Sequence, residues 1–507
     1  MKFAVYDKGS YPTQGKELFY FYRDNWDDYS YKTSFVAYYY DSKGMLIEIG
    51  PVKIGYVGME RGAVYDTIPK KFAALPETFF SLGQSDEYYE HLKKLGHSVR
   101  EHILVALNDI AYDLDRFEKV ANENVVRISL LRDVSKVSVK YQFNRIAHGG
   151  VRLTNWKFKY SSPLPETEDI FSSIDLTFSV NPNLNPPSNI HVLIGRNGTG
   201  KTRLLQNMIR SIRFDTAEFG TFGYSHPGGY AGRDQFANIL CVAFSPFDDF
   251  SCTLEGESEI PYTYIGLDKT SSNLIEAIKD QFWDSFMRCM SNSSKKQRWI
   301  NTVQILKSDP AFEKSRIDFF TQVFEEGFKL ESTKKTAELQ IRNTFSELSS
   351  GHKVTLLIIT SCVDKLVERS IVFMDEPENH LHPPLLSAFV RAFSYLLTER
   401  NGVAVISTHS PVILQEVPHN CVWALRRQEH NLIAERLPIE TFGSNIGLLT
   451  SQVFGLEVTE SGFHKLISDA VEKYGDYDQI VKAFQESLGE EAKGILRTLL
   501  ALKERRG

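Results

Sequence analysis

The sequence predicts an α/β fold, because short strands that are apolar almost throughout alternate with helical patterns along the second half of the chain. Three of these strands carry the prediction. Residues 191–194 run into a glycine-rich loop, residues 371–374 are followed by two carboxylates, and residues 403–408 are followed by a histidine. Strands that are buried on both faces are typical of a sheet covered by helices on both sides.

Length and composition limit the function classes. The 507 residues are enough for two or three domains, although one enlarged α/β domain is also open. A net charge of −6 argues against a globally basic nucleic-acid-binding protein but leaves local basic patches open. Five scattered cysteines without a C-x-x-C pair favour reduced thiols over disulfides or a zinc site. Because the sequence shows neither a signal-peptide core nor an apolar run of about 18 residues, we expect a cytoplasmic, soluble protein without membrane contact.

The first half of the chain divides into three predicted parts. Residues 1–85 are β-rich, and we assign them to the main α/β domain as its antiparallel edge, with a separate small domain as the alternative. Residues 86–120 form a helical insertion, because apolar residues recur there at steps of three and four. Residues 121–254 return to strand-like alternation and then contain the glycine-rich loop.

The second half adds three further parts. Residues 255–347 form a helical subdomain, residues 348–455 contain the two later strands, and residues 456–507 form a helical tail. The apolar faces of the tail either pack on the chain's own core or dock a partner. Residues 294–299, SKKQRW, combine cations with an aromatic residue; this pattern either grips a nucleic-acid backbone or, more commonly, begins a solvated helix.

The glycine-rich loop reads GRNGTGKT and fits the pattern G-x-x-x-x-G-K-[ST] between a strand and a helix. Its glycines allow a turn in which successive N–H groups converge on phosphate oxygens, and the next helix adds its positive dipole end. Lys201 is expected to reach the β- and γ-phosphates, and Thr202 to offer its hydroxyl to Mg²⁺. The loop therefore predicts ATP and Mg²⁺ binding through Gly195, Arg196, Asn197, Gly198, Thr199, Gly200, Lys201 and Thr202.

Two carboxylates close the strand at 371–374. Asp375 stands where a Walker B aspartate holds the metal, and Glu376 follows it directly. Such a carboxylate can polarise the water that attacks the γ-phosphate. An acidic pair at the end of a strand is weak evidence alone, but after a phosphate loop it predicts an ATP hydrolase with Asp375 as metal ligand and Glu376 as catalytic residue.

The segment FSELSSGH at 345–352 precedes an apolar helix and resembles the LSGGQ signature of the ABC-type ATPases. Leu348, Ser349 and Gly351 match that signature, whereas Ser350 and His352 depart from it. In that superfamily the signature of one protomer covers the γ-phosphate bound to another. The resemblance implies an ABC-type P-loop ATPase fold, a head-to-tail dimer or higher homo-oligomer, and contacts of Ser349, Ser350 and Gly351 with ATP held by a second protomer. A plain helix cap at Ser349 is the alternative.

His409 follows the strand at 403–408 and aligns with the switch histidine of the ABC-type ATPases, which contacts the γ-phosphate and the attacking water. The resemblance therefore implies a catalytic role for His409. It also implies that residues 379–382 meet the partner protomer. His380 and His382 lack a third ligand at a suitable spacing, so we predict no metal site there. SPFD stands at 245–248, where the superfamily has its glutamine loop.

Longer segments resemble the PtuA ATPases of Septu and retron anti-phage defence systems, which are SMC-like members of the AAA family. The similar segments are DEPENHLHP at 375–383, THSP at 408–411, residues 81–92 and residues 442–464. This resemblance implies an ATPase that regulates an HNH nuclease of the PtuB type. It also implies a retron reverse transcriptase with its DNA–RNA product as further partner.

Other functions stay open at this point. A stand-alone SMC-like DNA-binding or repair ATPase is one, although the residues between Lys201 and Leu348 show none of the sustained heptads of its long arms. A nucleotide-gated scaffold with little turnover fits the same motifs. A nuclease activity of this chain is disfavoured, because the sequence has no HNH-like motif and no carboxylate cluster outside the ATPase motifs.

Overall fold

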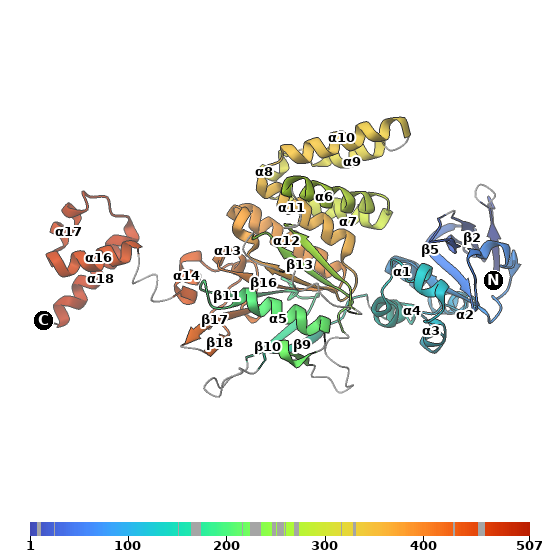
Figure 1. Cartoon of the computed structure of the whole chain (residues 1–507), viewed down its shortest axis with the longest axis horizontal. Helices are drawn as coiled ribbons and strands as arrows, with labels where there is room; N and C mark the ends of the chain where they lie inside the picture. Colours follow the sequence, from blue (N-terminus) through green and yellow to red (C-terminus); the bar gives the residue numbers. More distant parts are fainter. Residues whose placement is uncertain are drawn as a thin grey trace.

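The computed structural model covers the chain, and we describe all residues except 8–11, 25, 151, 164–173, 215, 224–234, 246–249, 251–257, 259, 268–272, 316, 328–330, 429–430, 455–461 and 507. Most of the SPFD segment expected near a glutamine loop lies outside the described residues. Figure 1 shows an N-terminal unit, a central α/β unit and a set of C-terminal helices. Within the described ranges, no helix is both long and apolar enough to span a membrane.

Seven described strands form the central sheet in the order β14-β13-β15-β16-β11-β17-β18. All neighbours are parallel except β17 and β18. This arrangement, with helices on both faces, confirms the predicted α/β fold. The strands are β11 (Ile190–Gly195), β13 (Ile239–Ala243), β14 (Tyr262–Gly266), β15 (Ile371–Asp375), β16 (Val403–Thr408), β17 (Val422–Gln428) and β18 (Asn431–Glu435).

Successive residues of the central strands face two different cores. Val192 and Ile194 pack with helices on one face, whereas Leu193 between them packs with α5 (Lys201–Phe214) and a small antiparallel sheet on the other. In Figure 1 the α11 and α12 layer lies on one side of this sheet and α5 on the other. The covering elements are β9 (Trp156–Ser161), β10 (Asp175–Val180), β12 (Thr221–Gly223), α11 (Ser350–Lys365), α12 (Pro383–Glu399), α13 (Pro411–Leu414) and α14 (Ile446–Phe454).

The helical subdomain begins later than residue 255, because β14 pairs with β13 and belongs to the central sheet. Its helices are α6 (Leu274–Met290), α7 (Ser293–Leu306), α8 (Pro310–Glu313), α9 (Asp318–Gly327) and α10 (Glu331–Glu347). The basic segment at 294–299 does not form an exposed surface for a nucleic-acid backbone, because three of its residues are bound within the protein. Trp299 is buried and donates to Thr360 Oγ1, while Lys295 pairs with Asp364 and Arg298 is buried beside Glu87.

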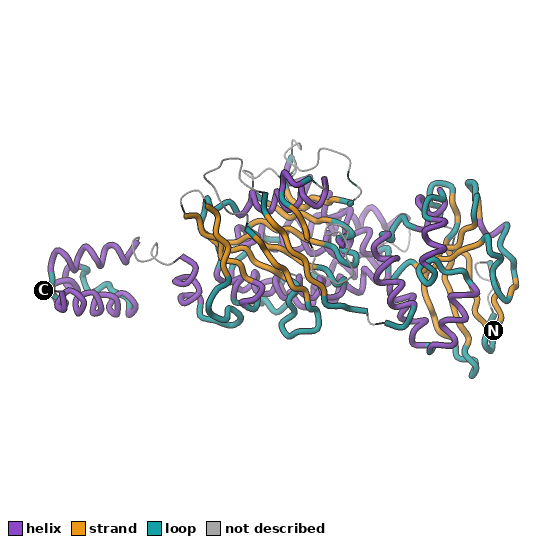
Figure 2. The backbone as a smooth tube through the Cα atoms, turned by 90° about the horizontal axis from the view of Figure 1, so that it is seen from below, coloured by secondary structure: helices purple, strands orange, loops and turns teal. Residues whose placement is uncertain are grey.

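The N-terminal unit has its own sheet, which corrects the assignment of residues 1–85 to the edge of the main α/β domain. Its six described strands pair only with one another, in the order β7-β1-β2-β4-β5-β8. Figure 2 shows this sheet and the central sheet as separate groups of strands. The strands are β1 (Lys2–Tyr6), β2 (Leu18–Arg23), β4 (Ser34–Tyr40), β5 (Leu46–Tyr56), β7 (Lys71–Phe72) and β8 (Phe79–Gly83), beside the short pair β3 (Tyr31–Lys32) and β6 (Gly62–Ala63).

Residues 86–147 cover this sheet as helices and share its hydrophobic core. The prediction of strands after residue 121 is wrong up to residue 147. Val126 and Ser129, and likewise Val139 and Gln142, are buried at a spacing of three, which places both residues on one face of a helix but on opposite faces of an alternating strand. The elements are α1 (Asp86–Lys94), α2 (His97–Ala106), α3 (Leu114–Val120), the π-helical turns Val126–Leu130 and Ser138–Phe143, and α4 (Asn144–Ala147).

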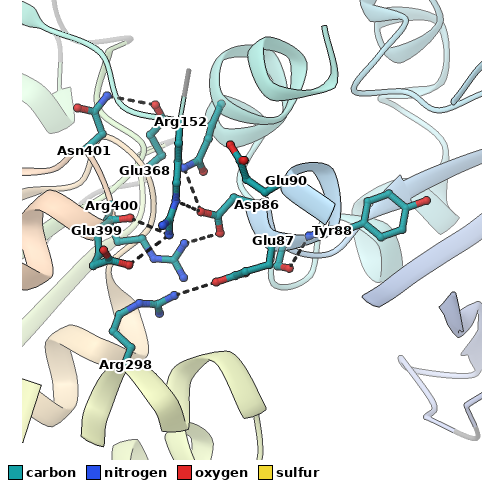
Figure 3. A network of polar contacts seen from close by, with 12 residues as sticks. Asp86, Glu87, Tyr88, Glu90, Arg152, Arg298, Glu368, Glu399, Arg400 and Asn401 are labelled. Carbon is teal, nitrogen blue, oxygen red and sulfur yellow. Dashed lines mark hydrogen bonds and ion pairs between the residues drawn. The ribbon is translucent and has the colours of Figure 1, made fainter. Parts of the chain in front are cut away.

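A buried polar network joins the N-terminal unit to the central unit (Figure 3). Asp86 is 1% exposed and accepts hydrogen bonds from Arg152 Nε at 2.9 Å and Arg400 Nη1 at 2.8 Å. Arg298 of α7 lies 3.6 Å from Glu87. Burial would raise the pKa of Asp86, but Arg400, Arg152 and Arg298 together hold it well below its ordinary value. The N-terminal unit is therefore fastened to α7 and to the C-terminal end of α12.

The C-terminal helices pack on one another. Ile467, Ile480 and Leu496, one from each helix, are buried in a small core of their own. On α16 the large apolar side chains of Phe463 and Leu466 are exposed. The helices are α16 (Gly462–Tyr474), α17 (Tyr477–Ala483) and α18 (Glu490–Arg506).

Candidate nucleotide-binding site

The strand order brings three predicted motifs to one edge of the central sheet. Strand β16 lies between β11 and β15, with Ile194 of β11 beside Thr408 and Asp375 of β15 beside Ser407. The segments that follow these parallel strands leave the sheet at the same edge. The phosphate loop, the carboxylate pair and His409 therefore face a common region.

The phosphate loop has the backbone that its glycines permit. Gly198 and Gly200 have φ values of +78° and +94°, a region that side chains with a Cβ rarely adopt. A Cβ on Gly195 would lie 2.4 Å from the carbonyl oxygen of Leu425 on β17, so this position has no room for a side chain. Thr199 closes the turn by donating from Oγ1 to the carbonyl of Arg196 at 2.9 Å. Arg196 reaches outward and donates from Nη2 to the carbonyl of Phe454 at 2.9 Å.

Lys201 lies inside the curve of the loop and is only 5% exposed. Its Nζ donates to the carbonyls of Gly195 at 2.9 Å and Arg196 at 3.1 Å. Burial lowers the pKa of Lys201, although the nearby charges of Glu376, Asp375 and Glu378 act in the opposite direction. The ammonium group is thus held mainly by neutral carbonyls, and an anionic phosphate would be a stronger partner for it.

Oxygen atoms suited to Mg²⁺ meet at Asp375. Thr202 Oγ1 donates to Asp375 Oδ2 at 2.9 Å, and Ser407 Oγ donates to Oδ1. Asp375 is buried at the end of β15, whereas Thr202 is half-buried in the first turn of α5. Carboxylate and hydroxyl oxygens are the protein ligands that Mg²⁺ prefers, so these two residues fit the metal that the sequence implies. Ser407 was not singled out from the sequence, where it is one residue of an apolar strand.

Glu376 lies on a sharp turn after β15. Its φ of +44° is in the left-handed region, which costs a residue with a side chain of order 1–3 kcal/mol. The turn is held by its N–H, which donates to Ser407 O at 3.0 Å, while Asn379 Nδ2 donates to Oε2 at 3.3 Å. Because of this turn, the carboxylate of Glu376 lies 3.5 Å from Nδ1 of His409.

Glu378 is a site residue that the sequence reasoning missed. It lies in the 3₁₀ turn Pro377–His380, and its Oε1 accepts hydrogen bonds from Thr408 Oγ1 at 2.5 Å and His409 N at 2.9 Å. The signal was present, because Glu378 is the third carboxylate of the DEPE segment. His380 and His382, which could be interpreted as metal ligands, are the more conspicuous residues of that segment. His382 instead caps α12, where its Nδ1 accepts from Leu385 N at 3.3 Å.

The signature segment lies at the start of α11. Ser349 is its N-cap, and its Oγ accepts from His352 N at 3.4 Å. Gly351 packs against the turn after Glu376, where a Cβ would lie 2.6 Å from His380 O. Ser349 and Ser350 are exposed, and within the described residues 349–351 make no hydrogen bond with residues 195–202 of the same chain. The structure thus does not bring the signature onto the phosphate loop within one protomer.

This chain is similar to a family model and to a phage protein. Residues 343–415 match the family model described as "AAA domain, putative AbiEii toxin, Type IV TA system". The protein ea59 of Escherichia phage lambda is 37% identical over 525 residues, which cover 99% of this chain and 98% of that protein.

Solved structures of transporter ATPases are similar to this chain, with low TM-scores. The ADP conformation of an ATP-binding cassette of an ABC transporter is 12% identical, with a TM-score of 0.31 over 61% of this chain and 98% of that one. The cbiO1 protein of Clostridium perfringens, part of an ABC transporter complex, is 15% identical, with a TM-score of 0.28 over 63% and 96%. The fold described above rests on strand order and not on these scores.

Proposed function

We propose that this chain, which belongs to the family of the protein ea59 of Escherichia phage lambda, binds ATP with Mg²⁺ and hydrolyses the ATP. The observation that carries the proposal is the convergence of Lys201, Asp375 and Glu376 at one edge of the sheet, with Thr202 hydrogen-bonded to Asp375. The match of residues 343–415 to an AAA-domain model supports it.

Each group has a distinct role in this proposal. The N–H groups of Gly195–Thr202 and the ammonium of Lys201 bind the phosphates, and Thr202 and Asp375 hold Mg²⁺, which when bound neutralises developing charge on the phosphates. Glu376 accepts a hydrogen bond from the attacking water and orients it. His409 contacts the γ-phosphate. The protein contributes positioning and electrostatic stabilisation rather than covalent chemistry.

The active form in this proposal is a homo-oligomer in which two protomers enclose ATP. The exposed Ser349 and Ser350 at the N-terminus of α11 support it, because free N–H groups and hydroxyls suit an anion. Within one chain these groups do not meet the phosphate loop, which supports a site that a second copy completes.

We further propose that the ATPase regulates an effector, an HNH nuclease of the PtuB type, in anti-phage defence, with a retron reverse transcriptase and its DNA–RNA product as additional partner. Exposed Phe463 and Leu466 on α16 support a docking role for the C-terminal helices. A stand-alone SMC-like DNA-binding ATPase or a nucleotide-gated scaffold is the alternative.

The deciding experiment combines native mass measurement with steady-state ATP turnover, for wild type and Glu376→Gln. We expect turnover by wild type, an assembly of two or more copies with ATP, and an ATP-bound variant whose turnover is lower by about 10²–10⁴. Normal turnover by Glu376→Gln would remove that residue from its role. A strict monomer in all conditions would overturn the shared site.

A further inference from the structure

The carboxylate of Glu378 is buried beside the site and is only half satisfied. Its side chain is 8% exposed. Oε1 accepts from Thr408 Oγ1 and His409 N, whereas Oε2 is buried and has no hydrogen-bond partner among the described residues. A buried polar atom without a partner costs about 1–3 kcal/mol, and more for a charged group. An unsatisfied buried oxygen calls for an explanation, and a role at the neighbouring site is one.

The ring of His409 lies beside this carboxylate. Its Nδ1 lies 3.3 Å from Glu378 Oε1 and 3.5 Å from Glu376 Oε1, and the side chain is 44% exposed. Nδ1 is the ring nitrogen that faces both carboxylates, and a proton on Nδ1 would be donated to them because ionised carboxylates only accept hydrogen bonds. Nε2, on the opposite side of the ring, is then the atom that meets the nucleotide.

Glu376 cannot serve His409 and the attacking water equally well. A carboxylate that accepts a hydrogen bond from the imidazole has fewer oxygen lone pairs left for the attacking water. Glu376 would have to bind both the ring of His409 and the water. Glu378 can take over the contact with the ring, because it already accepts a hydrogen bond from the backbone N–H of His409 and its Oε1 lies 3.3 Å from Nδ1.

We propose that Glu378 is a positioning residue for ATP hydrolysis, which holds His409 through Nδ1 and thereby leaves Glu376 to the water. The inference rests on the proposed function. Glu378 also fixes the end of β16, because Thr408 Oγ1 donates to it and accepts from Ser410 N at 2.8 Å. The carboxylate thus sets both the backbone and the ring of the histidine that faces the γ-phosphate.

The test compares Glu378→Gln with a matched control, Glu440→Gln. Glu440 makes the same pair of contacts with a histidine, accepting from His419 N at 2.9 Å and lying 2.8 Å from its Nδ1, but it lies near the start of β17 at the opposite edge of the sheet. Glutamine keeps the size of the side chain. With its carbonyl oxygen in the place of Oε1 it keeps the hydrogen bonds from Thr408 Oγ1 and His409 N, but it removes the negative charge that faces Nδ1.

The measurements are kcat and KM for Mg²⁺-ATP and the unfolding temperature of each full-length variant. We expect Glu378→Gln to lower kcat at least about tenfold, since small displacements of reacting groups have effects of this size. KM is expected to stay within about twofold of that of Glu440→Gln, and the unfolding temperature within about 2 °C.

Each other outcome overturns the inference. Equal kcat in the two variants would leave Glu378 without a role in hydrolysis. A parallel loss of ATP affinity and of unfolding temperature in Glu378→Gln would assign it to structure alone. Absence of turnover in the wild type would instead remove the proposed function itself, which the first measurement of the series detects.

Discussion

The buried charges at the domain junction and those at the nucleotide site differ in the partners that they face. At the junction Asp86 is surrounded by arginines, and their charge outweighs burial and holds its pKa low. At the site Lys201 is held by carbonyl oxygens, and burial outweighs three nearby carboxylates and lowers its pKa. A buried charge that is paired with opposite charges holds two surfaces together. A buried charge that is hydrogen-bonded to neutral groups can exchange those groups for a charged ligand.

The two networks are attached to opposite ends of one helix. Glu399 and Arg400 at the C-terminal end of α12 belong to the junction, and the turn of Glu376 and Glu378 leads into its N-terminal end. A helix of 17 residues spans roughly 25 Å and transmits displacement along its axis.

The largest expected effect comes from Asp86→Asn. It removes the buried carboxylate that the partly buried Arg152 and Arg400 share, and removal of one partner from a buried ion pair costs about 3–5 kcal/mol in the free energy of unfolding. Urea unfolding measures this loss. Glu118→Gln, which breaks only the exposed pair with Lys140, is the control and is expected to cost less than about 1 kcal/mol. Equal costs would mean that the junction is no tighter than a surface ion pair.

Breaking the other network is expected to act on binding instead of folding. Lys201→Ala removes the ammonium group from the phosphate loop and is expected to raise the Kd for Mg²⁺-ATP at least about 100-fold, or ~2.7 kcal/mol, with little change in the free energy of unfolding. Titration with a fluorescent ATP analogue measures the affinity. Arg203→Ala, which removes an exposed cation from the same helix, is the control. A Kd that changes equally in both variants would contradict a specific role for Lys201.

The part of the molecule that could be predicted from sequence is the part whose strands are apolar throughout. Strands β15 and β16 can be predicted without knowing which strands pair with them, because a fully apolar run is stable only between two layers. The order of their motifs along the chain predicts that Asp375, Glu376 and His409 lie together at one edge of the sheet.

What could not be predicted depends on tertiary contacts. The aromatic strands of residues 28–60 alternate in the same way whether they extend the central sheet or form their own, and only pairing decides between the two. Residues 125–147 contain β-branched pairs that favour strands locally, yet they become helical against the N-terminal sheet. The contacts of Glu378 depend on the left-handed turn at Glu376, a backbone conformation that cannot be predicted from the residue type.

The smallest expected effect concerns another buried carboxylate, Asp109, which sharpens the comparison because no cation among the described residues pairs with it. Its partners are neutral: Ser81 Oγ, Tyr89 OH and the N–H groups of Ala111 and Tyr112 donate to it. Burial outweighs these bonds and raises the pKa of Asp109 to about 7.

With this raised pKa the folded protein binds the proton of Asp109 more tightly than the unfolded chain does. The stability that this proton contributes is complete below the unfolded pKa near 4 and is lost as the pH rises through about 7, with a slope of at most about 1.4 kcal/mol per pH unit. Asp109→Asn cannot titrate, so its unfolding temperature relative to wild type is expected to rise between pH 5 and 8. A constant difference over that range would show that Asp109 is ionised throughout. Neutral donors would then stabilise a buried charge as well as the arginines around Asp86 do, and the distinction drawn between the two networks would fail.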